Sequence, residues 1–352
     1  MPLNQTLADV LQFDGWEGAQ DLLDEATVDT PTVSGFDKHF NRSVPISADE
    51  TDQDTIRTLV RVENPPVDPF RIANEGVGTS KGKYEERMLK LATATWYWHA
   101  DTSIIDKNPA RGAKYMESEA KGVIASNMEV LEKQFFYGTG LYKNGFQGLA
   151  NFVDPEMVID AGGTGNNLTS IWFVWWNPKG IEWTYGQKGS MKLSEPEIVH
   201  VTELVDSETK KFPAYQQYLQ FYPAVAIRHR WACARVVNVD VTSAMIQNGQ
   251  VANSVTTNHV TDLLLRQVAG LFPSGSAPNV IYMQPQVNLL LAASRSTVVL
   301  ANQKGGTTLH GSATPPGDSF DGIPIVYTKN IKIGEPRYVK QNKVWVPETQ
   351  TP

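Results

Sequence analysis

Cysteine is almost absent from this sequence of 352 residues, which contains only Cys233. A single cysteine excludes an intrachain disulfide and any zinc site built from several cysteines. The six histidines are scattered along the chain and form no HxH or HxxxH pair of the kind that favours a metal site. We therefore expect neither a metal nor another cofactor.

Long hydrophobic runs are also missing. The longest, residues 171–176, has six residues, against about 20 for a membrane-spanning helix. The N-terminus has no basic residue ahead of an apolar stretch, so it does not resemble a secretory signal. We expect no membrane association.

Positive charge is scarce in the first part of the chain. The net charge is −7, from 31 basic and 38 acidic residues, which argues against a general grip on nucleic acid. Residues 1–56 hold 12 acidic residues and only Lys38 and Arg42, a net −10, which leaves +3 for the remainder. Two interpretations stay open: a solvated terminus, or an arm that docks on basic patches of another copy.

Catalytic signatures are missing as well. No GxxxxGK[ST] or GxGxxG motif occurs. The GxSxG match at 78–82 lies in a glycine-rich stretch and not at the strand-to-helix turn of a nucleophile elbow. The glycine-rich stretches at 162–165, 186–190 and 304–308 are typical of tight turns. Cys233 stands between alanines and is expected to be a small buried residue. The sequence predicts that this protein is not an enzyme.

A long two-stranded projection is predicted after the acidic region. Residues 55–62 have a strand pattern, residues 64–69 form a proline-rich break, and residues 75–83 form a glycine-rich tip. Residues 84–99 return as a strand with charges of both signs. A solitary hairpin is marginally stable in water, so we expect this element to lie on a neighbouring molecule.

A long helix is predicted over residues 111–137. Apolar residues recur at spacings of three and four, and Gly138 stands where a left-handed C-cap belongs. On the opposite side, Glu117 and Glu129 each precede a lysine by four residues, which indicates a solvated face.

The rest of the chain mixes strands and helices. Residues 171–176 predict a strand covered on both faces, and residues 279–283 a short buried strand. Helices are expected at 255–271 and from Pro285 onward, and strands at 322–331 and 339–346. This order indicates an α+β fold rather than a doubly wound one.

An aromatic cluster offers a competing function. Trp172, Trp175, Trp176 and Trp183 could stack on sugars, as in a carbohydrate-binding β-rich protein such as a virion decoration or fibre. Their continuous apolar surroundings favour a place in the core, but the alternative stays open.

Several motifs, in this order along the chain, resemble the major capsid proteins of short-tailed and related tailed phages. These are FYG at 136–138, GFQGLA at 145–150, VIDAGGTG at 158–165, TSIW at 169–172, YGQKGS at 185–190, AIR at 226–228, RVVNVD at 235–240, IYM at 281–283 and FDGIPI at 320–325. The resemblance spans about residues 55–335.

The resemblance implies the Hong Kong 97 fold, with an N-terminal arm, an extended β-hairpin loop, a long spine helix, a peripheral domain and an axial domain. The expected division is listed in chain order: the acidic arm at 1–54, a peripheral-domain strand and extended loop at 55–110 (loop about 64–100), the spine helix at 111–138, mainly axial domain at 139–300, and closing peripheral strands with the C-terminus at 301–352.

The function implied is that of a capsid subunit. It would form pentamers and hexamers of an icosahedral head around double-stranded DNA, bound without sequence specificity, and assemble in the bacterial host cytoplasm with a portal, a scaffold and a possible cementing protein. The expected interface residues on the loop are Arg71, Glu75, Lys81, Lys83, Glu85, Glu86 and Arg87. Two interpretations stay open for Arg228, Arg230 and Arg235: partners for the acidic arm, or part of an ordinary solvated strand.

Overall fold

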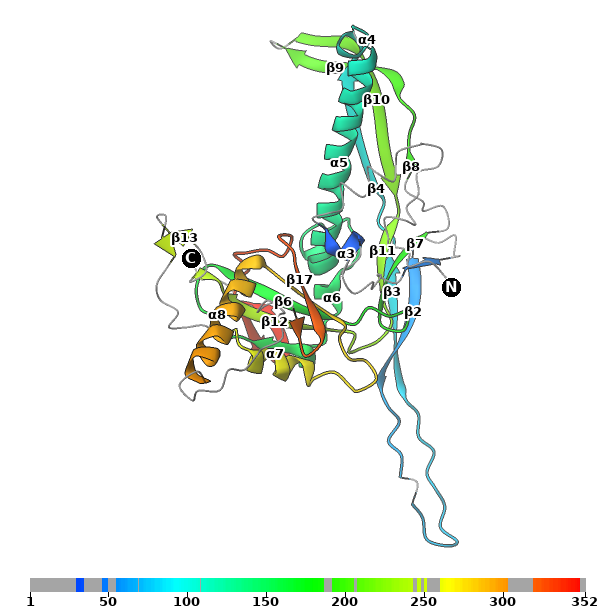
Figure 1. The fold of residues 1–352 in the computed structure, drawn as a ribbon. Helices are drawn as coiled ribbons and strands as arrows, with labels where there is room; N and C mark the ends of the chain where they lie inside the picture. Colours follow the sequence, from blue (N-terminus) through cyan, green and yellow to red (C-terminus); the bar gives the residue numbers. More distant parts are fainter. Residues whose placement is uncertain are drawn as a thin grey trace.

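The computed structural model describes residues 30–34, 46–49, 55–68, 70–107, 109–186, 192–205, 208–242, 246–247, 250–251, 260–302 and 319–348. The described part is elongated (Figure 1), with a long helix and strands beside it, a body around a six-stranded sheet, and a hairpin that projects from the body.

The spine helix α5 spans Pro109–Tyr137 and confirms the predicted helix. Its apolar stripe is buried at Ala120, Ile124, Met128, Leu131 and Phe135. The two predicted ion pairs form on the other side, from Glu117 to Lys121 at 3.4 Å and from Glu129 to Lys133 at 3.2 Å. Gly138 has φ of 56° and ends the helix in the left-handed region, as predicted.

A mixed six-stranded sheet forms the centre of the body, in the order β16-β17-β15-β6-β12-β5. Its strands are β5 Val158–Asp160, β6 Leu168–Val174, β12 Cys233–Asp240, β15 Val280–Met283, β16 Ser319–Phe320 and β17 Ile323–Tyr327. Every residue of β6 and β15 is buried, which confirms strands covered on both faces, although β6 ends at Val174 and not at residue 176.

Successive residues of β6 point into two different cores, as the period of two in a strand requires. Trp172 belongs to a core shared with Phe135 and Phe136 of the spine helix. Phe173 belongs to the second core, which contains residues of α7 Asp262–Ala269 and α8 Pro285–Asn302. The sheet therefore lies between the end of α5 and the pair α7 and α8.

The helix predicted at 255–271 is shorter than expected. Residues 260 and 261 are not helical, and Thr261 caps α7 by accepting a hydrogen bond from the Leu264 amide at 3.3 Å. A threonine cap satisfies an amide that has no partner within the helix, so the helix begins at Asp262. Residues 255–259 lie outside the described part.

A second sheet runs beside the spine helix (Figure 1). It contains β4 Ala94–Asp101, β8 Lys192–Leu193, β9 Glu197–Val205 and β10 Glu208–Phe221, and β10 pairs with each of the other three. The short helix α4 Thr102–Asp106 connects β4 to α5. The assignment of residues 139–300 mainly to an axial domain stays a prediction. Strands β8, β9 and β10 fall within this range, but they lie beside the spine helix (Figure 1).

The projection contains β2 Thr55–Glu63 and β3 Lys83–Lys90, which pair antiparallel. The strand at 55–62 is confirmed. The expectation that residues 84–99 form one returning strand is wrong: β3 ends at Lys90, and β4 pairs with β10 in another sheet. Ala92, between the two strands, is buried and donates its amide to Pro223 O at 3.1 Å, so the chain turns into the core there.

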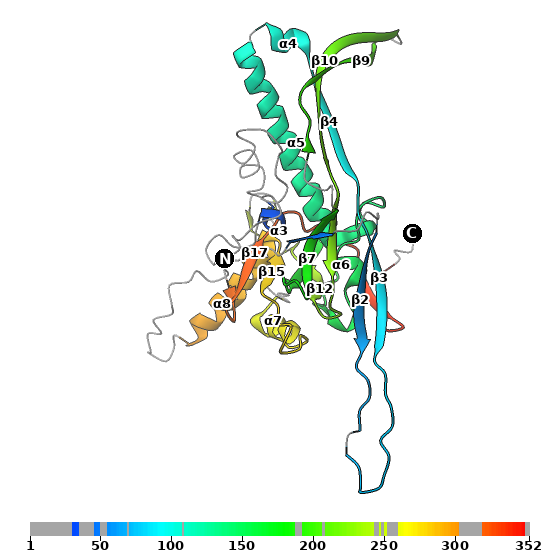
Figure 2. The ribbon, with the colours of Figure 1, turned by 90° about the vertical axis from the view of Figure 1, so that its right-hand side faces the viewer.

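The N-terminal region contributes two short described elements. Helix α3 spans Pro31–Ser34, and β1 Ile46–Asp49 pairs in parallel with β7 Ile181–Gly186, which also pairs with β11 Pro223–Ile227. Figure 2 shows β7 between α3 and the hairpin. The helix expected near residues 3–11 lies outside the described part.

Residues 339–346 form a hairpin rather than the single strand predicted. β18 Tyr338–Gln341 pairs with β19 Val344–Pro347. Asn342 and Lys343 between them have φ of 48° and 67°, as a two-residue hairpin turn requires. The remaining short elements are α6 Leu149–Phe152, η1 Gly138–Gly140, η2 Pro155–Met157, β13 Ile246–Gln247 and β14 Gln250–Val251.

Candidate assembly interface

The projecting hairpin has two different faces at its root. Thr58 and Val60 of β2 and Leu89 of β3 point inward and are buried. Their outward neighbours in β2 are Arg57, Leu59 and Arg61, all exposed. The inner face attaches the hairpin to the body, and the outer face meets solvent.

The outer face is apolar as well as charged. Leu59 is 67% exposed and Met88 is 61% exposed, and Tyr84 lies opposite Arg61 across the pair of strands. The guanidinium of Arg61 lies 5.3 Å from the centre of the Tyr84 ring. Large apolar side chains that stand in water between cations are typical of a protein-binding surface.

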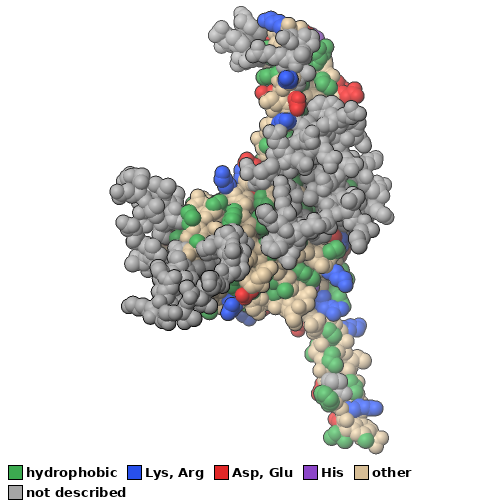
Figure 3. Space-filling model, in the orientation of Figure 1, with side chains coloured by type: hydrophobic (Ala, Val, Ile, Leu, Met, Phe, Trp, Pro, Cys, Tyr) green, Lys and Arg blue, Asp and Glu red, His purple; other side chains and the backbone are tan. Residues whose placement is uncertain are grey.

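Beyond the strands, the loop carries its largest apolar side chains in the open. Phe70 is 90% exposed and Ile72 is 78% exposed, and Val67 is exposed with them. Figure 3 shows hydrophobic and basic side chains along the projection. Sequence reasoning selected only the charged residues of this loop. The sequence does contain an indication of the exposed apolar residues: Phe70 and Ile72 stand in a segment without the apolar spacing of a buried strand or helix.

The charged residues predicted on the loop divide into two groups. Arg71 donates to the backbone oxygen of Glu75 at 3.1 Å, and the Glu75 carboxylate accepts from the Ile72 amide at 3.3 Å, so these two residues order the loop locally. Lys81 and Lys83, on the returning side, are exposed.

The structure separates the three neighbours at 85–87. Glu85 and Glu86 are exposed, and Glu86 pairs with Arg57 at 3.6 Å. The Arg87 side chain is only 10% exposed, with its guanidinium 5.3 Å from the Phe152 ring centre and 3.7 Å from Glu85. Arg87 therefore points into the body and helps to fix the hairpin.

Arg228 and Arg230 lie at the root of the hairpin and already have partners in their own chain. Arg230 pairs with Asp154 and donates to the Val62 oxygen at 3.0 Å. The hydrogen bond to Asp154 raises the pKa of Arg230. Arg228 donates to the buried Glu182 at 2.6 Å. The Arg228 side chain is still 40% exposed, so Arg228 is partly available to another molecule.

A hollow of about 400 Å³ lies where the outer face of the hairpin meets the turn after β11. The hairpin contributes Leu59, Arg61 and Tyr84 to its lining, together with one acidic residue, Glu63. The turn contributes Arg228, His229 and Trp231. Partial burial lowers the pKa of His229, which favours its neutral form. Two arginines beside apolar rings suit an acidic segment that also carries apolar side chains.

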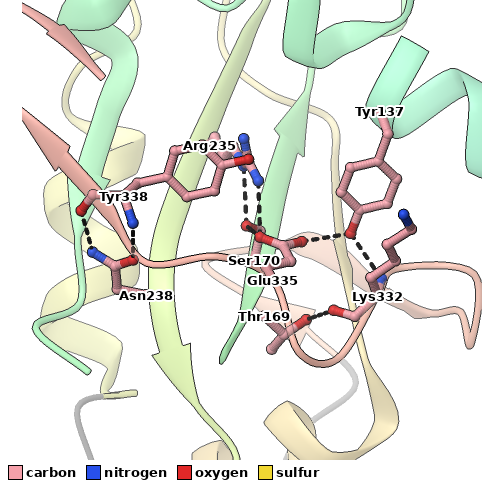
Figure 4. A network of polar contacts seen from close by, with 8 residues as sticks. All are labelled: Tyr137, Thr169, Ser170, Arg235, Asn238, Lys332, Glu335 and Tyr338. Atoms are coloured by element: carbon pink, nitrogen blue, oxygen red, sulfur yellow. Dashed lines mark hydrogen bonds and ion pairs between the residues drawn. The ribbon is translucent and has the colours of Figure 1, made fainter. Parts of the chain in front are cut away.

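Arg235 is placed wrongly by the sequence prediction. It is buried in a network between β6, β12 and the C-terminal part of the chain (Figure 4), where its Nη2 donates to Glu335 at 2.8 Å. Its guanidinium lies 4.8 Å from the Trp172 ring centre and 4.4 Å from that of Tyr338. Its partner in this chain is Glu335, and burial removes it from the surface on which an arm would dock.

The same network includes the end of the spine helix. The Tyr137 hydroxyl donates to Glu335 and accepts from the Lys332 amide at 2.7 Å. Burial and the neighbouring Glu335 raise the pKa of Tyr137 well above its usual value. The network ties the helix, the sheet and the C-terminal strands together (Figure 4).

The tryptophan cluster belongs to the core, although Trp175 is only partly buried against it. Trp172, Trp176 and Trp183 are buried, and Trp176 stacks on Phe135 of the spine helix at 5.1 Å between ring centres. Cys233 is buried as predicted, and burial raises the pKa of its thiol to about 12. Within the described residues, no helix has the length and apolar character to cross a membrane.

This combination of spine helix, projecting hairpin and central sheet is the Hong Kong 97-like fold of tailed-phage capsid subunits. The structure of bacteriophage Epsilon15 is similar, with 18% identity and a TM-score of 0.55 over 82% of this chain and 86% of that chain. The bacteriophage JBD30 capsid aligns at 13% identity and a TM-score of 0.40, over 86% of this chain and 98% of that chain.

The family described as "Major capsid protein GP7" matches residues 45–339. The chain belongs to this family and is a phage major capsid protein. A comparison with curated proteins found no match. The expectations of an α+β capsid fold and of a capsid function are both confirmed.

Proposed function

We propose that this capsid protein assembles through the β2–β3 projection into pentamers and hexamers of an icosahedral head that encloses double-stranded DNA. Its role is structural, not catalytic. The protein functions in the virion after assembly in the host cytoplasm with a portal, a scaffold and a possible cementing protein. Rings of identical subunits need a surface that fits a different surface on the next copy.

One observation carries this proposal: the projection exposes Phe70, Ile72 and Leu59, with cations between them. A monomer gains nothing from large apolar side chains held in water. Contact with a neighbouring subunit would bury them, and Lys81 and Lys83 would meet acidic groups at the rim of that contact.

The test is particle assembly by chains altered in the loop. Charge reversal with K81E and K83E together, or replacement with F70S and I72S together, should reduce particle yield in sedimentation and electron micrographs. The unassembled subunit should keep its unfolding midpoint because these side chains are exposed. Wild-type yield from both double variants would overturn the assignment of the projection.

The acidic arm is the second part of the proposal. Residues 1–29 contain seven acidic residues and no lysine, arginine or histidine, and they also carry Leu11, Phe13 and Trp16. Charge complementarity supports docking of this segment at the hollow beside Arg61 and Arg228 of another copy. Arg230 has a smaller part in such docking because Asp154 and Glu156 already pair with it.

A further inference from the structure

A completely buried carboxylate joins the N-terminal segment to the spine helix. Glu132 of α5 has no exposed surface. Its Oε1 accepts from Thr32 N at 3.0 Å and from Thr32 Oγ1 at 2.9 Å. Its Oε2 accepts from Thr328 Oγ1 at 2.7 Å and from Asn330 Nδ2. One oxygen therefore holds the N-terminal segment, and the other holds the turn after β17.

The segment that Glu132 holds is set deep in the protein. Thr30, Thr32 and Val33 have no exposed surface, and Val33 belongs to the core around the spine helix. Trp183 of β7 donates its indole N–H to the Thr32 oxygen at 2.8 Å. The acidic residues 1–29 directly precede this point, so it is where the arm is attached.

No described cation balances the charge of Glu132. Among the described residues, the titratable group that interacts with it is Tyr282 of β15, which is buried and has a pKa well above its usual value, so it is neutral. The described part of α3 has no charged residue, and Lys329 next to Thr328 is exposed. On α5 itself, Glu129 and Lys133 pair with each other on the exposed side.

We propose that Glu132 is a proton-sensitive anchor for the N-terminal segment, which is held most firmly when Glu132 is protonated and is released more readily as the pH rises. Four donors surround the carboxyl, but the hydroxyls of Thr32 and Thr328 can turn to accept its proton. The site therefore accommodates both the carboxylate and the carboxylic acid.

The direction of this pH dependence follows from the burial of Glu132. Burial raises the pKa of Glu132 in the anchored state. Withdrawal of residues 30–33 would admit water and return that pKa toward its usual value. The state with the higher pKa binds the proton more readily, so acid favours the anchored state, and the advantage is lost as the pH rises through the raised pKa.

An amide cannot replace this carboxyl. The Thr32 N–H faces one oxygen and the Asn330 side-chain amide faces the other, and both are obligatory donors. In Glu132→Gln, the amide nitrogen must therefore oppose one of them in either orientation. This variant removes the titrating group and also weakens the anchor.

Hydrogen exchange of the full-length unassembled subunit tests the anchor. The protection factor of residues 30–34, corrected for intrinsic exchange, should fall from about pH 5 to about pH 8, by at most about tenfold per pH unit for one proton. In Glu132→Gln, protection should be low and independent of pH. The matched control Glu129→Gln on the exposed face of α5 should keep the wild-type pH dependence.

A second variant does not alter the carboxyl. Thr32→Val removes one hydroxyl donor and keeps the Thr32 N–H, so protection should drop at every pH while its fall with rising pH remains. If the protection factor of residues 30–34 in the wild-type subunit stays constant over this pH range, the proposal is overturned, whether or not Glu132→Gln folds. A pH dependence of protection that survives in Glu132→Gln would overturn it as well.

Discussion

The single residue with the most unexpected position is Arg235. Its charge lies in the core, with Glu335 as ionic partner and the rings of Trp172 and Tyr338 close to the guanidinium. A buried charge is tolerated when it is paired and hydrogen-bonded. Removal of one partner leaves the other buried without compensation, which is far more costly than the loss of a surface pair.

Replacement of Arg235 by methionine should therefore destabilise the subunit by about 3–5 kcal/mol, because Glu335 keeps its buried carboxylate without a cation. Denaturant unfolding of the unassembled subunit measures this. The matched control is Arg266→Met, which breaks the exposed pair with Asp321 at 3.2 Å and should cost less than about 1 kcal/mol. Equal losses in the two variants would contradict the structural role of the buried pair.

The sequence predicts the burial of Cys233 correctly but not that of Arg235. Cys233 was expected to be buried because small apolar residues flank it, and it is. Arg235 lies two residues further along the same strand, and its nearness in sequence to Arg228 and Arg230 predicts a surface position instead. Its partner Glu335 is 100 residues away, and no local pattern links the two.

At the scale of elements, the spine helix is the best predicted part. Its apolar spacing, its solvated face and its C-terminal glycine all agree on the same boundaries, and local rules suffice because each interaction is within one helix. Gly138 is required by its geometry: a Cβ there would meet the Asn151 side chain and the Gly148 amide. Its φ of 56° is also unfavourable for a residue with a side chain.

Gly138→Ala should therefore lower the free energy of unfolding by more than about 2 kcal/mol, the sum of a left-handed backbone and a steric clash. Gly122→Ala, in the middle of the same helix, is the opposite case. A Cβ at Gly122 meets nothing within 4 Å, so the change should stabilise by about 0.5–1 kcal/mol through helix propensity. Thermal or denaturant unfolding distinguishes the two, and similar effects at both positions would refute this account of the helix end.

The hairpins were predicted less well than the helix because strand pairing is not local. The pattern over residues 84–99 is that of an extended chain, and the structure agrees at β3 and β4. The pattern does not tell which strand each half pairs with. The loop was recognised from its prolines and glycines, whereas its exposed apolar residues became visible only with the surface.

For the whole molecule, the uneven charge has a structural counterpart. An acidic segment of 29 residues is attached at a deep anchor, and the outer face of the hairpin presents Arg57 and Arg61 in the open. Contacts between exposed charges are screened by salt, with a Debye length of about 10 Å at 0.1 M and about 3 Å at 1 M. Assembly that uses the arm should therefore be sensitive to ionic strength.

Deletion of residues 1–29 should weaken this sensitivity. We expect the particle yield of the full chain to fall between about 0.1 M and about 1 M salt, and the yield of the deletion variant to change less over the same range. Sedimentation of both proteins at matched concentrations measures the difference. Identical salt profiles would argue against electrostatic docking of the arm, and assembly of both proteins would still support the shell function.

The stripe on the spine helix also limits how such a subunit can change size in evolution. Insertion of one residue into α5 rotates everything beyond it by about 100° and turns buried positions toward water. Seven residues make almost two full turns and lengthen the helix by about 10.5 Å with the stripe intact. Relatives with a longer spine should therefore differ by insertions that return the stripe to the same face, such as seven or eleven helical residues. Because β4 and β10 lie beside the helix, they should lengthen with it, so subunit length would evolve in discrete steps.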